Sequence, residues 1–345
     1  MARLVRPVPR SHRLIACALL LFLAQPHSGA QGPTYDQIVD RYAEGDTAGA
    51  VMVLSTWAPA VVKSAANDRP RTMSAQRQRA AVMLHTEVAY ALVQRSAIAD
   101  ASAHITSARR ILSVMKAGLS DARAQAFERR WYAFVASLFT AYTRFDDAEL
   151  TVRDGLGLYP RDARLHVARG VIREMSVTLF NPDPGSSIQL SRYARVLESA
   201  SADFRRAIGY DDTLSAAYLH LGWVHFVSGD DRAGADLESA LARADDNDTR
   251  YVAQLFLGAF EEHHERLDAA RLHYEAALGV GPNYQTAFVA LSRLEEALGH
   301  HSRAQELARA YASLRNRQED PWWNYRLGGF DQSSLDWLRH EARTP

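Results

Sequence analysis

The amino-acid sequence predicts an all-α protein and, more narrowly, an α-solenoid of antiparallel helix pairs. Two observations lead to this fold class. The composition is 47% hydrophobic with only 9% aromatic residues and 12 prolines in 345 residues, which suits long amphipathic helices. Small residues, leucines and aromatic residues also recur at intervals of about 34 residues, a period that is typical of helical-repeat architectures.

The first 30 residues have the layout of a secretory signal peptide. A stretch with four arginines precedes a short apolar run at 14–23, and Ser28, Gly29 and Ala30 supply the small residues of a cleavage site. The run is shorter than the roughly 20 apolar residues that a membrane crossing needs. We therefore expect cleavage after Ala30 and a periplasmic or secreted protein with no stable membrane span. The alternative is an uncleaved membrane anchor, which Pro26 disfavours.

Charge and cysteine content narrow the class of partner. Cleavage would remove Cys17, the one cysteine, so no disulfide is expected in the mature protein. It would also remove four of the 40 basic residues, which leaves a net charge of about −4 against the 40 acidic ones. Proteins that bind nucleic acid usually carry a basic excess. Nucleic acid is therefore not expected as a partner.

The clearest copy of the repeat begins near residue 251. Its first helix carries a Leu-Gly pair, and its second helix and the following turn carry alanines, an aromatic residue and a proline at fixed offsets: Leu257, Gly258, Ala270, Tyr274, Ala277 and Pro282. The preceding copy keeps this frame at Leu221, Gly222, Ala233, Leu237 and Ala240. Glycine and alanine allow two helices to approach closely, and the larger residues fill the space between pairs. The sequence therefore predicts stacked helix pairs.

Weaker copies extend the repeat toward the N-terminus. One lies at 129–162, and another begins at Gly170 and resumes at Ala200 and Phe204 after an insertion near 178–190. A degenerate copy starts near Tyr35, and residues 76–95 and 98–117 look like a further helix pair. The predicted domain organisation has four parts: a signal peptide at 1–30, degenerate repeats at 31–124, clearer repeats at 125–312 and a C-terminal cap at 313–345.

The C-terminal segment departs from the repeat pattern. We expect it to cap the last repeat, because Leu335 and Leu338 would lie on one side of a helix and could cover the exposed end of the core. Trp322 and Trp323 are interpreted as packing anchors. The alternative is that the two tryptophans form a platform for a ligand.

No motif for catalysis or metal binding stands out. The chain lacks the nucleophile elbow, the phosphate-binding loop and the common zinc motifs. The adjacent pairs His263-His264 and His300-His301 cannot each hold one ion, because neighbouring side chains on a helix point apart. The acidic run at 245–248 lacks the glycine and the glutamate of a calcium loop, and we expect it to cap a helix that begins near Thr249. The sequence predicts no enzyme activity, no cofactor and no metal site.

The chain resembles the tetratricopeptide-repeat (TPR) family, strongly over 215–312 and loosely before residue 125. The resemblance implies a right-handed superhelix that binds a protein or peptide through a concave groove lined by the first helix of each pair. Gln254, Glu261 and Glu295 depart from the family pattern. Carrying the groove positions over to this chain gives Leu219, Trp223, Phe226, Leu255, Glu262, Val289, Arg293 and Glu296.

The resemblance therefore implies an exported scaffold or adaptor that binds a polypeptide partner. An enzyme or solute-binding protein remains the alternative, with a site formed by the 178–190 insertion and the tryptophan-rich C-terminal segment.

Overall fold

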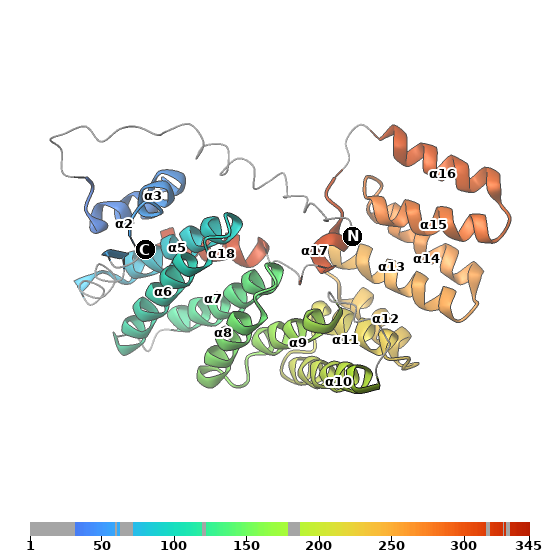
Figure 1. Cartoon of the computed structure of the whole chain (residues 1–345), viewed down its shortest axis with the longest axis horizontal. Helices are drawn as coiled ribbons and strands as arrows, with labels where there is room; N and C mark the ends of the chain where they lie inside the picture. The colour runs from blue at the N-terminus through green and yellow to red at the C-terminus, as the bar shows by residue number, and fades with distance from the viewer. Residues whose placement is uncertain are drawn as a thin grey trace. The chain divides into compact units, whose positions relative to one another are not determined.

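The computed structural model describes residues 32–58, 61–62, 72–118, 122–178, 187–314, 318–326, 328 and 332–345. Within these residues the regular elements are α-helices connected by turns, and the prediction of an all-α solenoid is confirmed (Figure 1). The predicted signal peptide with Cys17 and most of the predicted insertion lie outside the described residues. The chain divides into two compact units, unit 1 at 1–134 and 331–345 and unit 2 at 135–330.

The helices follow the predicted pairs. Unit 1 contains α2 (Tyr35–Ala43), α3 (Thr47–Leu54), α5 (Ala75–Gln94), α6 (Ile98–Gly118) and α18 (Gln332–Arg343), and α7 (Ala122–Ala141) spans the boundary between the units. Unit 2 contains α8 (Phe145–Leu158), α9 (Ala163–Thr178), α10 (Ser187–Tyr210), α11 (Ser215–Val227), α12 (Ala233–Arg243), α13 (Asn247–His263), α14 (Leu267–Val280), α15 (Gln285–Ala297), α16 (His301–Ser313) and α17 (Pro321–Arg326). None of the described helices combines the length and apolar composition of a membrane span.

Close helix contacts in unit 2 depend on glycine. A Cβ atom added at any of three glycines on first helices would lie within 3.0 Å of a side chain on the paired second helix: Gly170 with Phe204, Gly222 with Leu237, and Gly258 with Tyr274. Any larger residue would push the two helices apart. An equivalent glycine contact therefore occurs in three successive helix pairs, α9–α10, α11–α12 and α13–α14.

The positions that depart from the TPR pattern form polar links between neighbouring helices. The ring Nδ1 of His273 on α14 donates to the Gln254 side chain on α13 at 2.7 Å. The buried Glu295 on α15 accepts hydrogen bonds from Arg271 at 2.7 Å and from His300 at 2.6 Å. Polar groups inside a fold are stable when they are paired in this way. The departures therefore replace apolar packing with hydrogen bonds between helices.

Unit 1 contains a buried hydrogen-bonded row of three rings. The Tyr35 hydroxyl lies 2.9 Å from Nε2 of His85, and Nδ1 of His85 lies 3.0 Å from Nδ1 of His104. Burial lowers the pKa of His104 to about 4. Burial, together with the neighbouring His104, holds the pKa of His85 well below its usual 6.5. Both imidazoles are therefore neutral at physiological pH.

The C-terminal segment does not cap the last repeat, and that prediction is wrong. Helix α18 packs on α5 and α2 in unit 1, where Leu335 and Leu338 are buried. Arg339 of α18 donates to both carboxylate oxygens of the buried Glu87, at 2.9 and 2.8 Å, and the Tyr42 hydroxyl donates to the same carboxylate at 2.6 Å. The apolar side of α18 and its Arg339 thus pack against α2 and α5 and not against the last repeat.

Candidate binding surface

The first helices of unit 2 carry the short helix α17. Residues 318–326 follow the last repeat in sequence, yet α17 packs against α13, and Figure 1 shows it in red beside that helix. The contacts come from Asp320, which precedes α17, and from Trp322 and Tyr325 of the helix. We call the residues that receive them the α17 seat: Glu174, His220, Trp223, Tyr251, Phe256 and Thr286.

A buried carboxylate fixes the N-terminal end of α17. Asp320 Oδ2 accepts hydrogen bonds from the Tyr251 hydroxyl at 3.1 Å and from the Thr286 backbone N–H at 2.6 Å. Its other oxygen, Oδ1, accepts from the backbone N–H of Trp322 at 2.9 Å, which begins the helix. Burial and the adjacent Asp320 raise the pKa of Tyr251, so its hydroxyl stays protonated and donates. Asp320 therefore joins α17 to both α13 and α15.

Aromatic rings hold the middle of α17. The ring of Trp322 meets Trp223 edge to face at 6.1 Å and Phe256 at 5.5 Å, and Trp223 in turn stacks on Phe256 at 4.4 Å. The indole Nε1 of Trp223 is buried and has no hydrogen-bond acceptor among the described residues. The interpretation of the paired tryptophans as packing anchors is right for Trp322, whereas the neighbouring Trp323 is 50% exposed.

A tyrosine holds the C-terminal end of α17. The Tyr325 hydroxyl donates to Oε1 of the fully buried Glu174 at 2.8 Å. Its ring stacks on the imidazole of His220 at 4.5 Å, and His220 Nδ1 lies 2.8 Å from Oε2 of Glu174. Burial, reinforced by the Glu174 charge, raises the pKa of Tyr325 well above its usual 10. The carboxylate of Glu174 is therefore shared between α17 and α11.

The structure divides the predicted groove residues into two groups. Leu219 and Leu255 are only 5% and 4% exposed and belong to the hydrophobic core, so their expected place on the groove surface is corrected. These two side chains fill the space between neighbouring helices. Trp223 and Phe226 are half-buried, with ring centroids 5.7 Å apart, and Trp223 contacts α17.

The second group of predicted residues lies beside the α17 seat and is open. Val289 on α15 is 52% exposed. Arg293 on the same helix donates to Glu262 of α13 at 2.6 Å and remains 64% exposed, while Glu296 pairs with His301 at 2.9 Å. This open strip combines an apolar side chain with an accessible guanidinium.

Sequence reasoning missed Glu174, His220, Asp320 and Tyr325 as contact residues. The spacing of an acid and two aromatic residues at positions 320, 322 and 325 was visible in the sequence. Its receiving residues lie on several different helices, and no local pattern connects them to it. The ligand platform expected in the alternative reading is also not favoured, because the side chain of Trp322 is engaged by the repeats.

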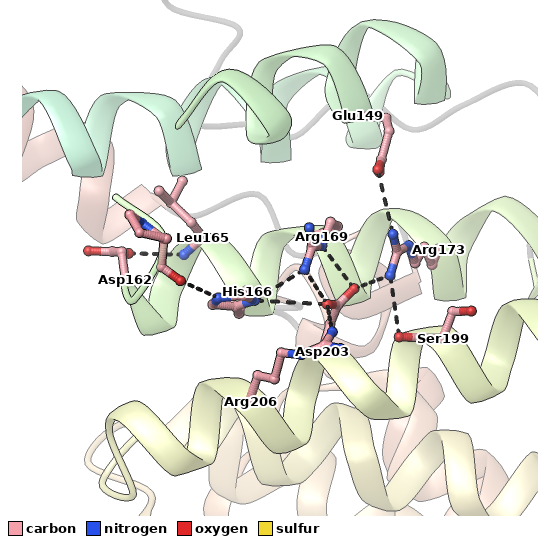
Figure 2. A network of polar contacts seen from close by, with 10 residues as sticks. Glu149, Asp162, Leu165, His166, Arg169, Arg173, Ser199, Asp203 and Arg206 are labelled. Carbon is pink, nitrogen blue, oxygen red and sulfur yellow. Dashed lines mark hydrogen bonds and ion pairs between the residues drawn. The ribbon is translucent and has the colours of Figure 1, made fainter. Parts of the chain in front are cut away.

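A second polar cluster lies between α9 and α10 (Figure 2). The side chain of Asp203 is completely buried and pairs with Arg169 at 2.6 Å, with Arg206 at 3.1 Å and with Arg173. Burial alone would raise the pKa of Asp203, but the nearby His166, the hydrogen bonds from Arg169 and the charges of Arg169 and Arg173 lower it below its usual value. A buried charge needs such pairing. The cluster fastens the two helices of the split repeat.

Unit 1 contains a cavity of about 530 Å³ between α3, α5 and α18. The Glu87–Arg339 ion pair forms part of its wall, and the complete lining is Thr47, Ala48, Val51, Glu87, Tyr90, Ala91, Gln94, Asp336, Arg339, His340 and Arg343. The charges of Glu87 and Arg339 satisfy each other. Within the described residues no group of three His, Cys, Asp or Glu side chains could hold a metal ion.

Comparison with known proteins gives matches in fold. No family model matches the chain, and no curated protein matches its sequence. Similar solved structures include PilW, a widely conserved type IV pilus biogenesis factor, with 18% identity over 61% of this chain and 90% of that one and a TM-score of 0.44. TTC0263, a TPR protein of Thermus thermophilus, has 21% identity over 62% and 97% and a TM-score of 0.41. A monomeric mutant of IFIT1 with Gppp-AAAA has 16% identity over 88% and 65% and a TM-score of 0.48.

Proposed function

We propose that this chain is an exported scaffold that binds a polypeptide partner through the first helices of unit 2 and carries out no catalysis of its own. One observation carries the proposal. These helices already hold a short helical segment, α17, through a buried carboxylate and two aromatic side chains. A surface that binds one helical turn in this way has the chemistry to bind a polypeptide segment.

The open strip beside the α17 seat supports an external partner. Val289 offers apolar surface and Arg293 offers a guanidinium, a group that is often among the strongest contributors to binding at protein interfaces. The proposed export rests on the arginine-rich start, the short apolar run and the small residues that end at Ala30.

Site-specific photo-crosslinking in living cells tests the proposal. A photoreactive amino acid at Val289 should crosslink to a polypeptide partner, while the same group at Leu272 should not. Leu272 is the matched control, because it is an aliphatic residue that is 67% exposed on α14, a second helix. Mass spectrometry of the purified exported protein should find its first residue near Gln31. Equal crosslinking at both positions, or at neither, would contradict binding by the first helices.

A further inference from the structure

The contacts of α17 define a ligand motif. We propose that residues 318–326 are an intramolecular ligand of unit 2, and that the external partner carries the same anchors and displaces them. The anchors are a carboxylate followed by aromatic side chains two and five residues later, as in Asp320, Trp322 and Tyr325. This inference rests on the proposed function and specifies the chemistry of the partner.

Each anchor enters a chemically different part of the α17 seat. The carboxylate of Asp320 meets two donors, a hydroxyl and a backbone N–H. The indole of Trp322 lies among aromatic rings, and the phenol of Tyr325 combines a stacked imidazole with a buried acceptor. Trp322 and Tyr325 are three residues apart and share one face of the helix. Trp323 and Asn324, the two residues between the aromatic anchors, are exposed. The α17 seat therefore selects the side chains at three positions of a ligand and does not select those at the two positions between the aromatic residues.

Two features make α17 displaceable. The helix has six residues, and a helix of this length is not stable in water without its contacts. The buried Nε1–H of Trp223 donates no hydrogen bond to α17 or to any other described residue. This donor has therefore lost its hydration without gaining a hydrogen bond. A competing segment that places a carbonyl or carboxylate oxygen there would bind more tightly than α17. A longer segment would also reach Val289 and Arg293.

The tether sets how strong the competitor must be. A segment that belongs to the same chain as its binding surface competes at an effective concentration on the order of millimolar. A free peptide with the same sequence and the same intrinsic affinity, supplied at about 10 μM, would therefore occupy roughly 1% of the unaltered protein. The physiological partner must bind at least about a hundredfold more tightly than the isolated motif. The partner would obtain this additional affinity from a hydrogen bond with Trp223 and from contacts with Val289 and Arg293 on α15.

The test uses the full mature chain and a fluorescein-labelled synthetic peptide of residues 318–326. In the variant with Asp320→Asn and Trp322→Ala, two anchors of α17 are lost, and the peptide should bind at least tenfold more tightly than to the unaltered protein, as measured by fluorescence anisotropy. Trp323→Ala is the matched control and should behave like the unaltered protein. A peptide with the same two substitutions should not bind. Equal binding to the unaltered and double-variant proteins, or binding to neither, would overturn the proposal.

A second measurement avoids the double variant if it does not fold. Hydrogen exchange of α17 in the unaltered protein should become faster in the presence of several millimolar peptide, because the peptide displaces the segment. Unchanged exchange would overturn the proposal. Crosslinking at Val289 is independent of both results, so failure of the peptide experiments with a polypeptide still crosslinked there would remove this inference and leave the proposed function standing. Peptide binding without any crosslinked polypeptide would leave residues 318–326 as an intramolecular ligand of unit 2 and would overturn the external partner, and with it the proposed function.

Discussion

Replacing Trp322 by alanine tests the α17 seat against a control on the same helix. The indole of Trp322 makes edge contacts with Trp223 and Phe256, whereas the adjacent Trp323 is half-exposed. Aromatic pairs contribute about 0.5–1.5 kcal/mol each beyond their buried area, so the two lost pairs account for about 1–3 kcal/mol. Loss of the partly buried indole surface adds a further 1–2 kcal/mol at roughly 25 cal/mol per Å². A value of about 3 kcal/mol is therefore expected for Trp322→Ala.

Hydrogen exchange detected by mass spectrometry measures this difference directly. A loss of about 3 kcal/mol shifts the equilibrium between docked and released α17 roughly a hundredfold, so exchange at the α17 amides should accelerate by a similar factor. Trp323→Ala should change exchange by less than about threefold, since exposed substitutions are usually within 0.5 kcal/mol. The same acceleration in both variants would refute the contacts assigned to Trp322.

Two further predictions concern stability. Because the unfolded chain protonates His85 and His104 below pH 6.5 while the folded chain keeps both neutral, the free energy of unfolding of unit 1 should fall as the pH drops from 6.5 toward 4, by up to about 1.4 kcal/mol per pH unit for each ring. Hydrogen exchange in α5 and α6 measures it, and a flat profile from pH 7.5 to 5 would contradict the buried pair. Gly258→Ala should destabilise unit 2 by about 1–3 kcal/mol through a clash with Tyr274, whereas Gly157→Ala, which meets no atom within 4 Å, should stabilise it by about 0.5–1 kcal/mol. Urea denaturation decides between these signs, and stabilisation by both would remove the packing role of Gly258.

The helix pairs could be predicted because their signals are local. Gly258 and Tyr274 lie on consecutive helices joined by one short turn, and Gly222 and Leu237 occupy the matching positions of the preceding pair. The sequence itself therefore indicates which two helices pack against each other. The cap at the N-terminus of α13 was predictable for the same reason. Asp246 accepts from the Thr249 backbone N–H at 2.7 Å, as the acidic run before that helix indicated.

The contacts of the C-terminal segment could not be predicted in this way. Leu335 and Leu338 correctly indicated a helix with one apolar side, but many apolar surfaces of the solenoid could have received it. The choice depends on distant polar partners, since Arg339 pairs with Glu87 and the hydroxyl of Tyr325 with Glu174. Neither acid differs in the sequence from the solvent-exposed glutamates around it. The sequence therefore predicted a groove along these helices, while the packing of α17 against them was missed.

The position of α18 has a consequence for the order of folding. Unit 1 begins near the start of the chain, but its helix α18 is synthesised only after the whole of unit 2. Until residues 332–343 emerge, the surfaces of α2 and α5 that bury Leu335, Leu338 and Ala342 lack their covering helix, and Glu87 lacks Arg339. The surfaces of α2 and α5 thus reach their final packing only after unit 2 has been synthesised, which leaves them available to chaperones until then.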